Sequence, residues 1–130
     1  MAATIFSSVK NDDKLLVASR GMVVLFDEPY NPKAVAVCAA HDMIMPNNPA
    51  TQISADDFGN DTLVLTMSDA QKNKIYAEFD NAINVYTLAV YAGRPEDYEV
   101  MDPCGKGIDE YKKCFDGLYE LVTGAAAKMN

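Results

Sequence analysis

One short stretch constrains the fold of this chain more than any other. Residues 62–67 have the sequence Thr-Leu-Val-Leu-Thr-Met, a largely apolar run of strand length. Ser68 follows, with Gln71 three residues later, which is a capping box that begins a helix. A strand of this continuous apolar character is typical of a parallel sheet, whose two faces are both covered. Parallel strands need helical crossovers, so the stretch predicts an α/β fold.

The rest of the chain alternates between helical and strand patterns in a way that extends this prediction. The 130 residues suit one domain, residues 1–130, with a three-layer sandwich and a mostly parallel sheet. The run 22–26 fits either a strand or a loop. We expect helices over 2–9, 31–42 and 68–79 and from 108 onward, a single helical turn over 54–57, and strands over 14–19, 62–67 and 84–88.

Charge and composition exclude several classes of partner. The net charge is −8 and the chain has only two arginines, Arg20 and Arg94, so we expect no nucleic-acid partner. No apolar run has membrane-spanning length, and residues 1–8 do not resemble a signal peptide, so we expect no membrane partner. The three cysteines lack CxxC spacing, which indicates neither a disulfide framework nor a zinc site and favours the cytoplasm.

The motifs of the common catalytic and cofactor sites are missing. There is no phosphate-binding GxxxxGK[ST] or GxGxxG sequence and no GxSxG elbow, so we expect no cofactor. His41 lies near the end of a predicted helix, where a structural role is the more common one. The best chemical candidate is Asp102 in the segment Asp102-Pro103-Cys104-Gly105-Lys106-Gly107, a permissive loop before the last helix. Its carboxyl group could act as a general acid if a nucleophile faced it.

The order of several segments resembles the low-molecular-weight protein tyrosine phosphatases. The strand 61–67 is similar to the family's "DLILTM" strand, and the resemblance continues along the chain. Ser19-Arg20-Gly21 stands where the family has Ser-Ala-Gly, and Thr51 replaces the arginine of an Ala-Arg-Gln segment. The other matching segments are Asn31-Pro32-Lys33-Ala34, Val85–Leu88, Tyr91–Gly93, Asp102-Pro103, Tyr111 and Cys114.

This resemblance implies a cysteine-based phosphomonoesterase acting on a phosphotyrosine protein or a small phosphomonoester. In such enzymes a Cys-x5-Arg loop supplies a thiolate nucleophile and binds the phosphate, and a phosphocysteine splits the displacement into two steps. The Asp of the Asp-Pro loop protonates the leaving group, and this role falls on Asp102 by resemblance. Cys104 stands in that loop where relatives often have an aromatic residue, which puts recognition of aromatic substrates in doubt.

The chain departs from the family at the nucleophile. Six residues after Cys38, Cys104 and Cys114 stand Ile44, Glu110 and Glu120, so no Cys-x5-Arg is present. The family loop ends in Arg-Ser-Pro-Met-Ala, and this sequence opens with Met1-Ala2. We therefore expect an N-terminally truncated domain without the first strand and the phosphate loop, and hence without activity. The alternative is a noncatalytic protein- or phosphate-binding module on the same fold.

Loss of the first strand has a structural consequence. The family sheet has the flavodoxin-like order 2-1-3-4, so its central position would be empty. Unpaired buried backbone groups cost roughly 1–3 kcal/mol each, and an open sheet edge favours self-association, so we expect a homodimer. A third, unrelated interpretation is a receiver-like regulatory domain, with Asp61 or Asp69 near a strand end. Cys38 and Cys114 on helix faces are expected to be small core residues.

Overall fold

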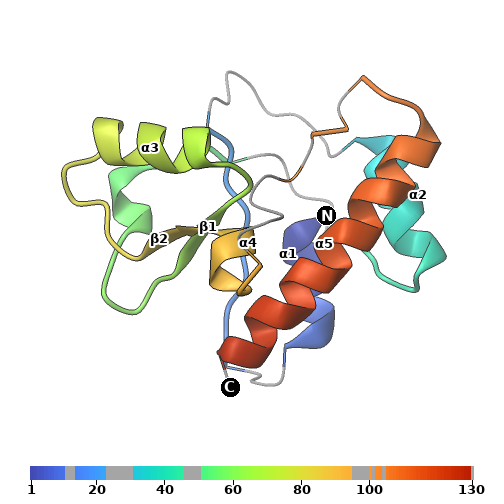
Figure 1. Ribbon diagram of the computed structural model, residues 1–130, viewed down its shortest axis with the longest axis horizontal. Coiled ribbons are helices and arrows are strands. Elements are labelled where there is room, and N and C mark those ends of the chain that lie inside the picture. The colour runs from blue at the N-terminus through green and yellow to red at the C-terminus, as the bar shows by residue number, and fades with distance from the viewer. Residues whose placement is uncertain are drawn as a thin grey trace.

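The computed structural model describes residues 1–10, 14–22, 31–45, 51–94, 100, 102–103 and 105–129. Figure 1 shows the longest helix, in red, running diagonally in front of the blue N-terminal helix, with the strands to its left. The elements in chain order are α1 (Ala2–Val9), α2 (Pro32–Ala40), the 3-10 turn η1 (Ala55–Asp57), β1 (Val64–Thr66), α3 (Asp69–Glu78), β2 (Val85–Thr87), α4 (Leu88–Tyr91) and α5 (Ile108–Lys128).

Strands β1 and β2 form the described sheet, and they are parallel as the sequence predicts. Val64 is aligned with Val85 and Thr66 with Thr87, and α3 provides the crossover between the strands. The turn into α3 follows the capping pattern, because the amide of Gln71 donates to Ser68 Oγ at 3.3 Å. The Gln71 side chain in turn accepts from the amide of Met67 at 2.9 Å. The α/β prediction is therefore confirmed.

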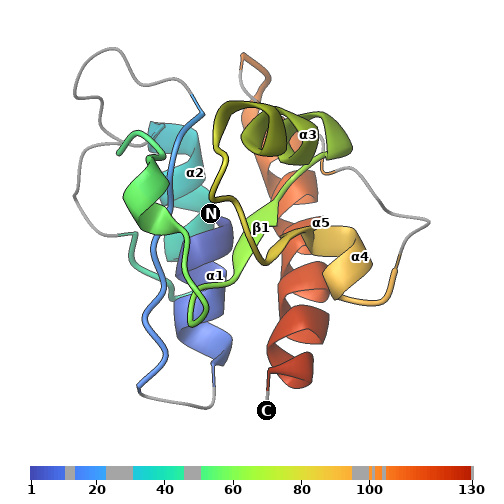
Figure 2. The same ribbon diagram turned by 90° about the vertical axis from the view of Figure 1, so that its left-hand side faces the viewer.

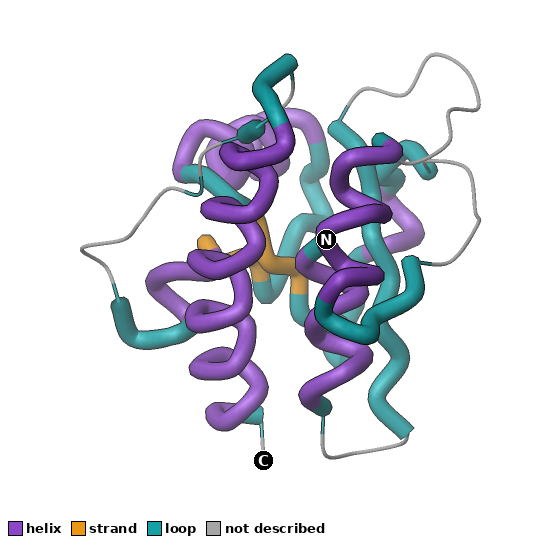
Figure 3. Tube along the Cα trace, turned by 90° about the vertical axis from the view of Figure 1, so that its right-hand side faces the viewer, coloured by secondary structure: helices purple, strands orange, loops and turns teal. Residues whose placement is uncertain are grey.

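The main core is built on α5. Its buried face packs against α1 and α2, and Figure 3 shows α1 and α5 together in front of the strands. The apolar spacing of α5 accounts for this, because residues three and four apart share one helix face. A second, smaller cluster of Ile53, Ile75 and Val85 lies around the sheet. The buried residues of α5 are Tyr111, Phe115, Leu118, Leu121, Val122, Ala125 and Ala126.

The prediction of a strand over 14–19 is wrong. These residues belong to no strand, and the nearest sheet-like contact is a single parallel bridge between Gly21 and Gln52. Figure 2 shows the 14–22 segment and β1 rising on opposite sides of the marked N-terminus. Leu16 is 91% exposed. An extended segment becomes a strand only when another strand pairs with its backbone, and within the described part of the chain residues 14–19 are not paired in a sheet.

The predicted strand 84–88 is shorter in the structure, where β2 spans Val85–Thr87 and Leu88 begins the short helix α4. The Thr87 side chain accepts from the amide of Val90 at 3.3 Å and caps this helix. Of the run 22–26, only Met22 lies among the described residues. The helices over 2–9 and 31–42 and the helical turn over 54–57 are confirmed.

Candidate active site

Asp102 lies in a segment that is tied to the rest of the fold on both sides. We call the described residues 100, 102–103 and 105–107 the Asp102 loop. Upstream, the amide of Val100 donates to the carbonyl of Met67 at 2.9 Å, directly after β1. Downstream, the amide of Lys106 donates to the carbonyl of Pro103 at 2.9 Å and closes a turn. Gly105 has φ +80 in this turn, a value that glycine adopts without strain.

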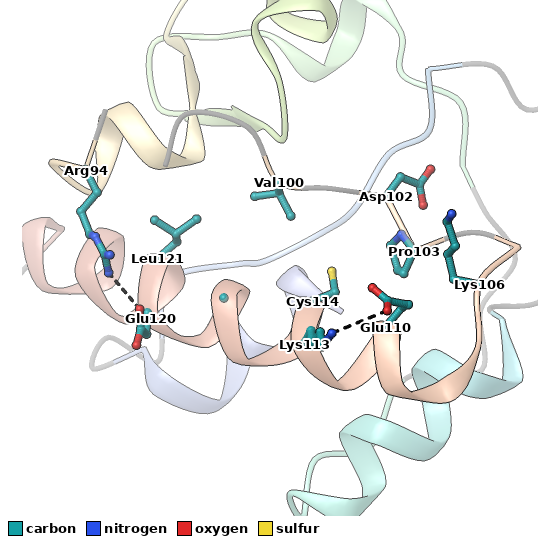
Figure 4. Close-up of a pocket in the computed structure, with 11 residues that line it drawn as sticks. Arg94, Val100, Asp102, Pro103, Lys106, Glu110, Lys113, Cys114, Glu120 and Leu121 are labelled. Carbon is teal, nitrogen blue, oxygen red and sulfur yellow. Dashed lines mark hydrogen bonds and ion pairs between the residues drawn. The ribbon is translucent and has the colours of Figure 1, made fainter. Parts of the chain in front are cut away.

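A pocket of about 490 Å³ lies between the Asp102 loop and α5. Figure 4 shows Asp102, Pro103 and Lys106 near the start of α5, and Arg94 and Leu121 at the far end. Two ion pairs line it, Arg94 to Glu120 at 3.0 Å and Lys113 to Glu110 at 3.7 Å. The lining residues are Arg94, Val100, Asp102, Pro103, Lys106, Glu110, Lys113, Cys114, Gly117, Glu120 and Leu121.

The position of Asp102 suits proton transfer to a group outside the fold. Its side chain is exposed, at one end of the pocket and at the carboxyl end of β1. Ligands of open α/β sheets bind beyond the carboxyl ends of the strands, so this is the edge where a substrate is expected. A carboxyl group there can reach a leaving group without crossing the core.

The described cysteines lack the surroundings of a nucleophile. Cys38 is buried on α2, and Cys114 lies half-buried on α5 at the pocket wall. Burial raises the pKa of the Cys38 thiol and of the Cys114 thiol above the ordinary value of 9.0. A catalytic cysteine needs a lowered pKa, so both thiols fit the predicted role of small core residues.

The raised thiol pKa values give a testable pH dependence. The folded thiols ionise at higher pH than the unfolded ones, so the folded state binds more protons above pH 9.0. The free energy of unfolding should therefore fall as the pH rises from 9.0 through the folded pKa values, and this contribution should be complete below that range. Urea denaturation at pH 8 to 10.5 measures it. The double variant Cys38→Ala, Cys114→Ala should show a shallower decline, and parallel curves for the two proteins would contradict the assignment.

Other residues singled out by the sequence lie away from Asp102. Ser19 and Thr51 line a second pocket of about 480 Å³, which does not include Asp102. Arg20 on that pocket pairs with Asp57 at 3.1 Å. Cys104 lies outside the described residues.

His41 has a structural position. It ends α2, and its ring stacks on Phe115 with centroids 4.1 Å apart. Phe115 belongs to the main core, so the histidine covers a buried aromatic ring at the edge of that core. This agrees with the structural role expected for it.

Sequence reasoning missed the charged partners along the pocket. The Arg94–Glu120 pair joins residues 26 positions apart, and no local spacing could have indicated it. Within the described part of the chain, no group of three or more His, Cys, Asp or Glu side chains could hold a metal ion. Over the same residues, no helix has the length and apolar character needed to cross a membrane.

Comparison with known proteins gives consistent matches. The family described as "Low molecular weight phosphotyrosine protein phosphatase" matches residues 1–130. The chain is 30% identical over 106 residues to the low molecular weight protein-tyrosine-phosphatase PtpB of Staphylococcus haemolyticus, covering 82% of this chain and 74% of that protein. It is 33% identical over 113 residues to Wzb of Salmonella typhi, another low molecular weight protein-tyrosine-phosphatase, covering 86% and 71%.

Solved structures agree with these matches. One is the YwlE arginine phosphatase carrying a phosphorylated active-site serine, with 28% identity and a TM-score of 0.84. The comparison covers 98% of this chain and 85% of that one. These matches contradict the receiver-like alternative, in which Asp61 or Asp69 would have been the functional carboxylate.

Proposed function

The chain belongs to the low molecular weight phosphotyrosine protein phosphatase family, and from this premise we propose that Asp102 is the general acid of a phosphomonoester hydrolase site. The observation that carries the proposal is the anchoring of the Asp102 loop at the carboxyl end of β1, through the Val100–Met67 hydrogen bond. This holds an exposed carboxyl group beside a pocket. In the forward step its proton would pass to the leaving oxygen of the ester as the bond to phosphorus breaks.

The nucleophile for this reaction is not in the 130-residue sequence. No cysteine has an arginine six residues later, and burial raises the pKa of Cys38 and Cys114. Only Arg20 and Arg94 could hold a phosphate through a guanidinium group, and both are engaged with carboxylates. We therefore propose that this chain contributes the acid side of the site and does not turn over phosphomonoesters by itself.

The turnover of p-nitrophenyl phosphate tests the proposal. The purified 130-residue chain should release p-nitrophenol at the rate of buffer alone, while PtpB of Staphylococcus haemolyticus serves as the active control. The proposal would be contradicted if the 130-residue chain hydrolysed p-nitrophenyl phosphate and the Cys38→Ser or Cys114→Ser variant did not.

The alternative function is a noncatalytic module that binds a protein or a phosphate group. The two proposed functions differ in phosphate binding, because a noncatalytic module should bind inorganic phosphate without hydrolysing an ester. Titration of the labelled chain with phosphate, followed by amide chemical shifts, distinguishes them. Saturating shifts at the Asp102 loop without turnover would favour the alternative.

The names of the relatives support a substrate class for the proposed reaction. They support a phosphotyrosine protein or a small phosphomonoester, while one structural neighbour is an arginine phosphatase. The net charge of −8 argues against a nucleic-acid substrate. The three cysteines of the sequence lack CxxC spacing and give no sign of a disulfide framework, and on that ground we propose a cytoplasmic location. We further propose that residues 1–130 form one domain, because α1 near one end of the chain packs on α5 near the other.

We also propose that the protein is a homodimer. The backbone amide of Val64 points toward β2, because it donates to the carbonyl of Asn84 at 3.0 Å. Backbone groups alternate in direction along a parallel strand, so the amide and carbonyl of Leu65 point away from β2. On that side the described residues provide no paired strand, and such an edge favours pairing with another chain.

Light scattering at micromolar concentration checks the oligomeric state. The expected mass is about twice the 14.2 kDa of one chain. Replacement of Leu65 by proline should shift the mass toward the monomer, because proline removes a backbone donor from the edge. A monomeric mass for the unmodified chain would contradict the proposal.

A further inference from the structure

We infer that Lys33 is a positioning residue for Asp102, and this inference rests on the proposed role of Asp102 as the acid. Lys33 lies in the first turn of α2, 73 residues from its contact in the Asp102 loop. Its ammonium group donates to the carbonyl of Lys106 at 2.7 Å. The contact therefore joins α2 directly to the loop that carries Asp102.

The contact lies where it can restrict the motion of the Asp102 loop. The carbonyl of Lys106 follows the turn closed by the Lys106 amide and the Pro103 carbonyl, and it precedes Gly107, the N-cap of α5. Val100 is held on the other side by Met67. Asp102 thus lies between one attachment to β1 and one attachment to α2.

Lys33 is itself held in place at both ends. Its backbone amide donates to Asn31 Oδ1 at 2.9 Å, the cap of α2. Its ammonium nitrogen lies 6.0 Å from the ring centroid of Tyr111, a cation–π distance. Tyr111 is 4% exposed and belongs to the main core, so the ammonium group is positioned against a rigid surface. A lysine fixed in this way can hold the loop more firmly than a freely rotating one.

The geometry has a chemical consequence for the acid. Proton transfer requires the carboxyl group to stay within hydrogen-bond reach of the leaving oxygen, so restricted loop motion favours it. Lys33 does not need to touch a substrate to have this effect. It acts through the backbone of Lys106.

Nuclear magnetic resonance of the labelled 130-residue chain tests this inference without measuring turnover. The readouts are the hydrogen exchange of the Lys106 amide and the carboxyl carbon signal of Asp102. Lys33→Met keeps an unbranched side chain one atom shorter and removes the charge and the donor. Loss of the hydrogen bond between Lys33 and the Lys106 carbonyl should speed exchange of the Lys106 amide by about three- to tenfold. The carboxyl carbon signal of Asp102 should shift at the same time. Lys112→Met, at an exposed lysine of α5, is the matched control and should change neither.

A second variant separates positioning from a general structural role. Lys33→Arg keeps a donor for the Lys106 carbonyl and can stack on Tyr111, so both readouts should return close to those of the unmodified chain. The amides of Leu118 and Val122 in the buried part of α5 should exchange at the same rate in all variants. The inference is overturned if Lys33→Met behaves like Lys112→Met, or if exchange at Leu118 and Val122 rises as much as at Lys106. Because no turnover is measured, an Asp102 that proves dispensable for catalysis would refute the proposed function and leave this result standing.

Discussion

Hydrolysis of p-nitrophenyl phosphate is expected to appear when a relative's N-terminal segment that carries Cys-x5-Arg is joined directly ahead of Met1. The backbone that would receive it is already in place, since the fold matches an arginine phosphatase over 98% of this chain with a TM-score of 0.84. A correctly placed thiolate and arginine would supply the Cys-x5-Arg pattern that the 130-residue sequence does not contain. The rate should rise by several orders of magnitude over the chain alone. The matched control is the same fusion with serine in place of the added cysteine.

Within that fusion, Asp102→Asn tests the acid. General acid catalysis contributes about 10²- to 10⁴-fold, so kcat for phenyl phosphate should fall by that order. p-Nitrophenol is a much better leaving group and needs less protonation, so kcat for p-nitrophenyl phosphate should fall by less. Asp109→Asn, at an exposed carboxylate in the first turn of α5, should leave both rates unchanged. Equal losses on the two substrates would contradict the assigned role, and so would an unaffected rate on phenyl phosphate.

The largest effect on stability is expected from Phe115→Ala. The Phe115 side chain is 2% exposed, and its ring stacks on His41 at 4.1 Å and lies 6.2 Å from the ring of Tyr119. Truncating a buried phenylalanine typically costs about 3–5 kcal/mol, because contacts are lost and a cavity remains. Marginal domains have only about 5–15 kcal/mol in total. Urea denaturation of the variant should therefore show a large fall in the transition midpoint.

A matched substitution on the same helix provides the control for this measurement. Lys112→Ala, at an exposed position of α5, should change the free energy of unfolding by no more than about 0.5 kcal/mol. A loss below about 1 kcal/mol for Phe115→Ala would mean that the α5 core does not determine stability as the burial indicates.

The parts of the fold that could be predicted from sequence are those specified by local patterns. The apolar run of β1, the Ser68 and Gln71 cap of α3 and the spacing along α5 depend on residues close together in the chain. Strand 14–19 could not be assessed in this way, because strand formation depends on a partner elsewhere. The helix α4 was missed because Leu-Ala-Val-Tyr is equally apolar in a strand, and the decisive Thr87 cap is one weak polar signal.

The candidate site also combines features that local sequence indicates with contacts between residues far apart in the chain. Asp102 was singled out from its loop and the family resemblance, and its role stays a prediction. The contacts around it could not be predicted, because Lys33 reaches Lys106 across 73 residues and Arg94 reaches Glu120 across 26. Contacts of this kind depend on how the elements pack in three dimensions, so the spacing of residues along the sequence does not predict them.

The packing of α1 on α5 also has a consequence for how the protein is made. A ribosome releases Ala2–Val9 well before Ile108–Lys128, yet these two helices share the main core. Apolar residues of α1 such as Ile5 and Phe6 therefore lack their native cover until α5 has been synthesised. Long-range contacts of this kind slow folding and leave apolar surface open to association in the meantime. Nascent chains that end before Ile108 should consequently depend on chaperones more than the finished protein does.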